Sequence, residues 1–153
     1  MSEGPSGWSP LFIDTGALFA YYNANDTGDR HARARSVFGA IQAGDLAYRP
    51  LLTSRYVLAE LATLLRRKVG HSTAVSALSD LRGSPAFTIC LLDDAGFAAT
   101  CEQFKQYDDQ QISFIDHSSA VLAQDHDTDH VFAFDDDFAT LGFTRVPVDT
   151  GDP

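Results

Sequence analysis

Two aspartates each follow directly after a short apolar run. Asp14 comes after residues 11–13, and Asp135 comes after residues 131–134. Either position alone is a weak signal, because aspartate also caps helices and forms turns. If both runs are strands of one parallel sheet, however, their carboxylates emerge at the same edge, where ligands bind in open α/β sheets.

Two further acids belong to segments with helical spacing. Glu60 lies on the border of the apolar stripe of the helix that we expect Ser54 to cap, and it is one of 3 glutamates beside 18 aspartates. A long acidic arm at the core border suggests a ligand, although an ion pair with arginine explains it equally well. Asp116 follows Ser113 by three residues, a spacing that also fits a capping box.

Four carboxylates at one rim would repel one another, and some would take up protons unless a cation lay between them. Mg²⁺ and Mn²⁺ prefer oxygen ligands of this kind. Such an ion can activate a water molecule and stabilise the oxygens of an in-line displacement at phosphorus. The chemistry indicated is therefore phosphodiester hydrolysis.

The segments that must position these acids alternate between strand and helix patterns. Strands are predicted at 11–13, 46–52, 87–92, 131–134 and 143–148, and helices at 17–22, 29–44, 54–70, 71–83, 93–107, 116–126 and 138–142. The strands are apolar throughout, which is typical of a parallel sheet covered on both faces. We predict an α/β fold with three α/β/α layers and a mainly parallel central sheet.

The length of 153 residues suits a single domain. We assign it to residues 11–148, with a flexible lead over 1–10 and a tail over 149–153. No apolar run approaches the roughly 20 residues that cross a bilayer, and the start of the chain lacks a signal-peptide pattern. We therefore expect a cytoplasmic protein without a membrane partner.

The formal charge of −10, with only 2 lysines, argues against nonspecific binding to nucleic acid, which relies on cations that neutralise phosphates. Two histidines, His31 and His117, are expected to face solvent. The best available phosphate contacts are the arginines of two predicted helices, Arg30, Arg33, Arg35, Arg66 and Arg67.

The four acids lie in short motifs: IDTGAL holds Asp14, LAEL holds Glu60, SFIDHSSAVLA holds Asp116 and FAFDDDFATLGF holds Asp135. In this order and spacing they resemble the PIN-domain family, particularly VapC-like toxins, over about residues 11–148. The resemblance implies a PIN-like fold and an endoribonuclease dependent on Mg²⁺ or Mn²⁺. By the same resemblance these four acids are the catalytic and metal-binding residues, with the hydroxyl of Thr15, and more weakly that of Ser113, as neighbours.

The chain departs from the family pattern around the last acid. The family often has Thr or Ser two residues before it, where this chain has Ala133. The triple aspartate also leaves the fourth ligand open between Asp135 and Asp137. We favour Asp135 because it follows the strand directly, keep Asp137 as a second candidate, and expect Asp136 to be solvated.

The resemblance further implies an RNA substrate, a cognate antitoxin and a homodimer. Two alternatives stay open, a PIN-domain protein of RNA processing and a non-catalytic RNA-associated or structural module. A receiver domain fits less well because Lys68 and Lys105 lie in predicted helices rather than after a late strand. A phosphatase of the haloacid-dehalogenase type would need Asp-x-Asp, whereas Gly16 stands two residues after Asp14.

Overall fold

The computed structural model describes residues 7–153, and that range contains five strands and seven helices. The strands are β1 (Ser9–Ile13), β2 (Tyr48–Ser54), β3 (Phe87–Cys90), β4 (His130–Ala133) and β5 (Thr144–Pro147). The helices are α1 (Thr15–Tyr22), α2 (Arg30–Ala43), α3 (Arg55–Lys68), α4 (His71–Gly83), α5 (Asp94–Gln106), α6 (Phe114–Asp125) and α7 (Asp137–Thr140).

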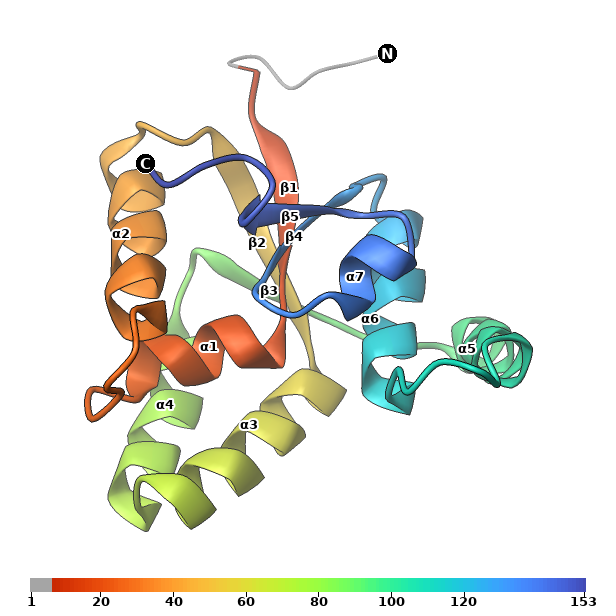
Figure 1. The fold of residues 1–153 in the computed structure, drawn as a ribbon, viewed down its shortest axis with the longest axis horizontal. Coiled ribbons are helices and arrows are strands. Elements are labelled where there is room, and N and C mark those ends of the chain that lie inside the picture. Colours follow the sequence, from red (N-terminus) through yellow and green to blue (C-terminus); the bar gives the residue numbers. More distant parts are fainter. Residues whose placement is uncertain (1–6) are drawn as a thin grey trace.

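The five strands form one sheet in the order β3-β2-β1-β4-β5, and every neighbouring pair is parallel. From β1 the chain steps through β2 to β3, then returns and steps through β4 to β5. Because crossovers between parallel strands are right-handed, the two directions place their helices on opposite faces. Figure 1 shows α1, α2 and α4 on one side of the sheet and α5, α6 and α7 on the other. The predicted three-layer fold is confirmed.

The order in which strands are added to the sheet reverses between β1 and β4. These two strands are neighbours, and the backbone N–H of Asp14 donates to the carbonyl of Phe132 at 3.0 Å. Their apolar runs are fully buried, with Phe12 and Phe132 each 0% exposed, because helices cover both faces. Such a reversal leaves a crevice beyond the carboxyl ends of the two strands, where Asp14 and Asp135 follow in sequence.

Three helix ends are capped by local chemistry, and the cap predicted at Ser54 is confirmed. Ser54 Oγ accepts from the backbone N–H of Val57 at 3.2 Å, and Asp93 Oδ1 accepts from that of Gly96 at 2.7 Å. Gly44 ends α2 in the left-handed conformation, with φ of 86°, which favours glycine.

All five predicted strands differ from the structure at one or both ends, and two of these differences show a physical cause. Strand β2 begins at Tyr48 rather than Leu46, because the backbone N–H of Leu46 donates to the carbonyl of Ala40 near the end of α2. Strand β3 ends at Cys90 rather than Leu92, and Leu91 is 64% exposed although its apolarity suggested a buried strand.

The predicted flexible lead lies outside the described residues for positions 1–6. Of the remainder, Ser9 and Pro10 already belong to β1, and the guanidinium of Arg49 lies 4.4 Å from the centre of the Trp8 ring. Across residues 7–153, no helix combines the length and apolarity that spanning a bilayer requires.

Candidate metal centre

Asp14 lies at the junction between β1 and α1. Its carboxylate caps the helix, with Oδ2 accepting from the N–H of Gly16 at 3.2 Å. The residue is only 2% exposed. Its second oxygen, Oδ1, and the neighbouring Thr15 Oγ1 are both buried and have no hydrogen-bond partner among the described residues. Helix capping therefore accounts for Oδ2 of Asp14 but not for Oδ1. The buried Oδ1 and the Thr15 hydroxyl are left to bind a ligand.

Asp116 lies in the first turn of α6 and is 9% exposed. The hydroxyl of Ser113 caps this helix by accepting from the Asp116 N–H at 3.0 Å. The predicted hydroxyl neighbour Ser113 thus has a structural role, and it is exposed. Its cap leaves the Asp116 carboxylate free to face the crevice.

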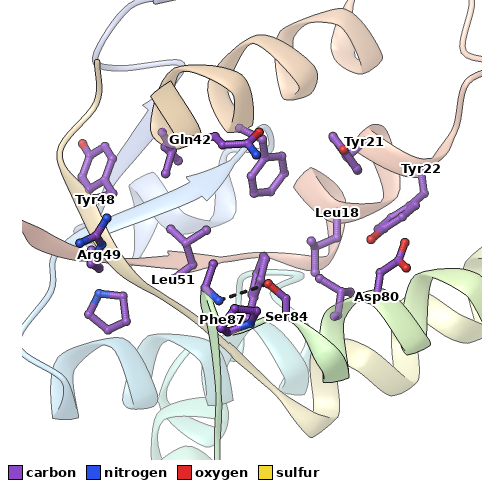
Figure 2. Close-up of a pocket in the computed structure, with 16 residues that line it drawn as sticks. Leu18, Tyr21, Tyr22, Gln42, Tyr48, Arg49, Leu51, Asp80, Ser84 and Phe87 are labelled. Atoms are coloured by element: carbon purple, nitrogen blue, oxygen red, sulfur yellow. Dashed lines mark hydrogen bonds between the residues drawn. The ribbon is translucent and has the colours of Figure 1, made fainter. Parts of the chain in front are cut away.

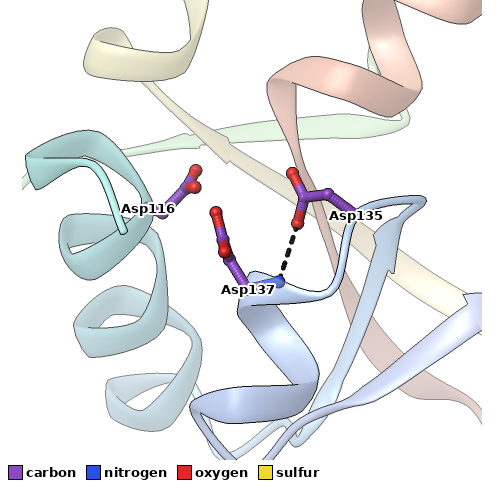
Figure 3. Close-up of side chains that lie close together, drawn as sticks. All are labelled: Asp116, Asp135 and Asp137. Atoms are coloured by element: carbon purple, nitrogen blue, oxygen red, sulfur yellow. Dashed lines mark hydrogen bonds between the residues drawn. The ribbon is translucent and has the colours of Figure 1, made fainter. Parts of the chain in front are cut away.

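Asp135 and Asp137 flank the turn between β4 and α7. Asp135 Oδ1 accepts from the backbone N–H of Asp137 at 3.2 Å, which ties the two residues together. One carboxylate oxygen from each of these residues and one from Asp116 lie within 4.8 Å of one another. Figure 3 shows the three side chains converging from α6, from the turn after β4 and from the first residue of α7.

The sequence left the fourth ligand open between Asp135 and Asp137. In the structure the carboxylates of both residues belong to the cluster with Asp116. Asp136 points elsewhere: its side chain is 95% exposed and pairs with Arg145 at 2.9 Å.

Asp14 and Glu60 lie outside this three-carboxylate group, yet both act on it electrostatically. Burial, and then the charges of Asp116 and Asp135, raise the pKa of Asp14 well above its usual value. The charge of Glu60, which is half-buried on α3, contributes to the raised pKa of Asp116. All four acids predicted from sequence therefore lie close enough for their charges to act on this group, to which Asp137 also belongs.

Burial and neighbouring charges raise the pKa of three of these acids, Asp14, Asp116 and Asp135. Burial, and then the charges of Asp135, Asp137 and Glu60, raise the pKa of Asp116 to about 7. Burial and the charge of Asp137 also raise the pKa of Asp135. Carboxylates that are costly to ionise together, all offering oxygen, fit a hard divalent cation such as Mg²⁺ or Mn²⁺.

Arg30 is a predicted phosphate contact whose charge acts on one of these acids. Its positive charge lowers the pKa of Asp135, against the larger opposing effects of burial and Asp137. The guanidinium groups of Arg30 and Arg33 lie 5.3 and 5.5 Å from the centre of the Phe134 ring. Arg33 is also paired with Asp152 at 2.9 Å, so Arg30 is the better candidate to meet a phosphate.

The expectation that His117 faces solvent is wrong. The residue is 0% exposed, because α6 is packed between the sheet and α5 and buries every residue from Asp116 to Ala123. Its Nδ1 lies 2.7 Å from Gln103 Oε1, and burial lowers the pKa of the imidazole. His31 is half-buried, with Nδ1 2.9 Å from the Ala20 carbonyl.

A separate cavity of about 530 Å³ lies between α1, α2, α4 and the amino ends of β2 and β3. Figure 2 shows its aromatic and apolar lining, including Tyr21, Tyr22 and Phe87, with Asp80 beside Tyr22. Burial, and then the charge of Asp80, raise the pKa of Tyr22 to about 12. With one carboxylate in its lining, this cavity does not have the ligands of a metal centre.

Comparison with known proteins connects this geometry to a family. Residues 11–144 match the family described as PIN domain. The chain is 30% identical over 138 residues to the 23S rRNA-specific endonuclease VapC20 of Mycobacterium tuberculosis, covering 89% of this chain and 97% of the relative. It is 29% identical over 125 residues to ribonuclease VapC26 of the same organism, covering 82% and 86%.

The fold agrees with the sequence comparison. The crystal structure of the Mycobacterium tuberculosis VapC20 protein, described as a sarcin-ricin loop cleaving toxin, matches with a TM-score of 0.78 and 30% identity over 89% of this chain and 98% of that one. The matched range of 134 residues contains every acid of the crevice and the strands that position them. The chain therefore belongs to the PIN domain family.

Proposed function

We propose that this protein is an endoribonuclease that hydrolyses RNA phosphodiester bonds with the help of Mg²⁺ or Mn²⁺. One observation carries the proposal: acids from four separate chain segments gather beyond the carboxyl ends of β1 and β4, where the strand order reverses. Among them, Asp116, Asp135 and Asp137 offer oxygens within 4.8 Å of one another. The names of the relatives, an endonuclease specific for 23S rRNA and a ribonuclease, support RNA as the substrate.

In this mechanism Asp14, Glu60, Asp116 and Asp135 are the catalytic and metal-binding residues, and Asp137 is a further ligand. When bound, a divalent cation supplies a more acidic water and stabilises negative charge at the phosphate. The chain itself orients the ligands: the Gly16 N–H fixes Asp14, and the Asp137 N–H fixes Asp135. The Thr15 hydroxyl, which is buried beside Asp14 and has no hydrogen-bond partner within residues 7–153, can hold a water or a phosphate oxygen. Arg30 brings a positive charge to a rim that otherwise repels the substrate.

The first test is cleavage of RNA by the purified chain. A transcript that contains a ribosomal RNA hairpin loop should be cut at defined sites in Mn²⁺ or Mg²⁺, and cutting should stop when EDTA removes the ion. Ca²⁺ offers a control, because it takes more oxygen ligands at longer distances and should support little cleavage. Equal cleavage in EDTA would contradict the metal-dependent mechanism.

The proposal includes a biological role as the toxin of a toxin–antitoxin pair, acting in the cytoplasm, where ribosomal RNA is found. The toxin named among the structural relatives supports this role over a part in RNA processing or a non-catalytic one. An antitoxin would block the acidic crevice, and the nuclease would form a homodimer.

Expression of the chain in a bacterial host should arrest growth, and co-expression of an antitoxin encoded beside it should restore growth. The Asp14→Asn variant is the matched control, because it should be harmless at the same expression level. Harmless expression of the fully active enzyme would favour RNA processing instead.

A further inference from the structure

Two adjacent serines of α6, Ser118 and Ser119, differ in how their hydroxyl groups are used. Both residues are 0% exposed. Ser118 Oγ donates to the carbonyl of Ile115 in its own helix at 2.6 Å. Ser119 Oγ has no hydrogen-bond partner within residues 7–153. Because an unpaired buried hydroxyl opposes folding, Ser119 calls for a partner that these residues do not supply.

The position of Ser119 on α6 turns its side chain away from α5. His117 faces α5, where its Nδ1 lies 2.7 Å from Gln103 Oε1. Residues two apart on a helix point to nearly opposite sides, whereas residues three apart are neighbours on one face. Ser119 therefore shares a face with Asp116, which Figure 3 shows pointing from α6 toward the other two carboxylates of the cluster.

The face of α6 that carries Asp116 and Ser119 is turned toward the end of β1. The helix packs against β1, β2 and α7 as well as α5. Among the neighbouring charges that raise the pKa of Asp14, that of Asp116 has the largest effect, so the two carboxylates lie close together. Because α6 leads back from the carboxyl edge of the sheet to the start of β4, Ser119 lies about one helical turn beneath Asp116.

Two further buried oxygens at the end of β1 make no hydrogen bond within the described residues. They are Asp14 Oδ1 and Thr15 Oγ1. Strand β4 offers them no hydroxyl: the register pairs Ile13 with Phe132, so the next residue, Ala133, lies beside Asp14 and has only a methyl group. Three buried oxygens, two from the end of β1 and one from α6, thus border one place beneath the metal centre.

We propose that Ser119 is a positioning residue of the metal centre: its hydroxyl, with Asp14 Oδ1 and the Thr15 hydroxyl, holds a buried water that fixes the Asp14 carboxylate for the cation. This inference rests on the metal-dependent function proposed above. A buried water typically makes about three hydrogen bonds to polar groups that are otherwise unpaired, and three such oxygens are present here.

The donors and acceptors of this arrangement balance. An ionised carboxylate only accepts, so the water donates one hydrogen to Asp14 Oδ1. A hydroxyl group both donates and accepts, so Thr15 and Ser119 can take the second hydrogen and fill a lone pair of the water. Each carboxylate oxygen has two lone pairs, which leaves Oδ1 able to face the cation as well. Such partners orient a metal ligand, and their loss typically weakens metal binding about 10- to 100-fold.

Calorimetric titration of the full chain with Mn²⁺ tests this role without RNA. Ser119→Ala should weaken Mn²⁺ binding about 10-fold or more. Its Tm in EDTA should stay near the wild-type value, since no hydrogen bond between the described residues is lost. Ser118→Ala is the matched control, because it removes the neighbouring buried hydroxyl. It should lower Tm through loss of the bond to Ile115 and leave the Mn²⁺ affinity unchanged.

Two further measurements separate positioning from packing. Ala133→Ser supplies a hydroxyl beside Asp14 from β4, so in the Ser119→Ala background it should restore most of the lost Mn²⁺ affinity. A crystal structure of the metal-free chain should show a water within about 3.2 Å of Asp14 Oδ1 and of the Thr15 and Ser119 hydroxyls. That water should be missing from the Ser119→Ala variant.

Wild-type Mn²⁺ affinity in Ser119→Ala would overturn the proposal. So would losses of Tm and affinity equal to those of Ser118→Ala, because they would show a packing effect alone. If the wild-type chain binds no Mn²⁺, the metal centre itself fails and Ser119 loses this role with it. If Mn²⁺ binds with the expected dependence on Ser119 but no RNA is cut, the ribonuclease function fails while the role of Ser119 stands.

Discussion

Replacing Asp116 with asparagine is expected to reduce metal-dependent RNA cleavage by about 10²- to 10³-fold, the scale of losing one preorganised electrostatic group. Asp116 is the member of the three-carboxylate cluster that comes from α6, so the substitution removes the one charged ligand that this helix supplies to the cluster. Asparagine keeps the size and one oxygen but removes the negative charge that attracts the cation. Single-turnover cleavage of a labelled RNA at fixed Mn²⁺ measures the effect.

The same substitution should stabilise the protein when metal is absent. Ionised Asp116 is buried beside Asp135 and Asp137, and this environment is the reason its pKa is raised to about 7. A neutral amide relieves the repulsion, which at pH 8 should increase the free energy of unfolding by about 1–3 kcal/mol. For a chain of this length, that corresponds to a rise in Tm of about 2–10 °C in EDTA. Loss of activity together with a gain in stability is the signature of a strained functional site and not of misfolding.

Asp136→Asn is the matched control for this experiment. Asp136 stands between two members of the crevice in sequence, yet it is exposed and paired with Arg145. Its neutralisation should leave cleavage within about twofold and alter stability by less than about 1 kcal/mol, because an exposed ion pair contributes little. The substitutions Asp14→Asn, Asp135→Asn and Asp137→Asn should each reduce RNA cleavage about as much as Asp116→Asn does. A large loss with Asp136→Asn and none with Asp116→Asn would refute the proposed centre.

The stability of the metal-free protein should fall as the pH rises from about 4 to 8. Folding raises the pKa of Asp14, Asp116 and Asp135, so the folded state holds protons that the unfolded chain has released. Under linkage, such groups contribute stability at low pH and lose it as the pH passes from their unfolded pKa to their folded pKa. For Asp116 this window extends from 3.8 to about 7.

His117 acts in the opposite direction, because burial lowers its pKa below 6.5 and its protonation at low pH opposes folding. The contribution of the carboxylates is therefore best read from the difference between wild type and Asp116→Asn. Thermal unfolding in EDTA at several pH values should show a gap in Tm that is small near pH 4 and widens toward pH 8. A gap that stays constant would mean that Asp116 keeps an ordinary pKa.

Divalent cations should reverse this trend. Mg²⁺ or Mn²⁺ competes with protons for the same carboxylate oxygens, so its apparent affinity should rise between pH 5 and 8 and its binding should release protons. The increase in Tm caused by saturating Mn²⁺ should accordingly be largest at high pH and nearly vanish in Asp116→Asn. Calorimetry in two buffers of different ionisation enthalpy would count the protons released.

The alternation of strands and helices was readable from local patterns, because each pattern depends on neighbouring residues. Strands β1 and β4 show as short apolar runs since both faces of a parallel sheet are buried, and Ser54 and Gly44 mark helix ends through their own side-chain and backbone chemistry. The four acids Asp14, Glu60, Asp116 and Asp135 could be singled out for the same reason, since each follows or borders a predicted element. Their grouping around one crevice needed the assumption of a parallel sheet, which the fold confirms.

Other features depend on contacts between segments far apart in the chain, and only the tertiary structure decided them. The turn before α7 places Asp137 beside Asp116, so both Asp135 and Asp137 join the cluster, while Asp136 pairs with Arg145. The burial of His117 results from α5 covering α6, a contact between two helices that the sequence alone does not pair. The contacts of the Phe114 ring with Tyr56, Phe97 and Phe104 likewise depend on α3, α5 and α6 meeting in space. Local sequence determines which elements form, whereas side-chain packing across those elements determines which chemical groups meet.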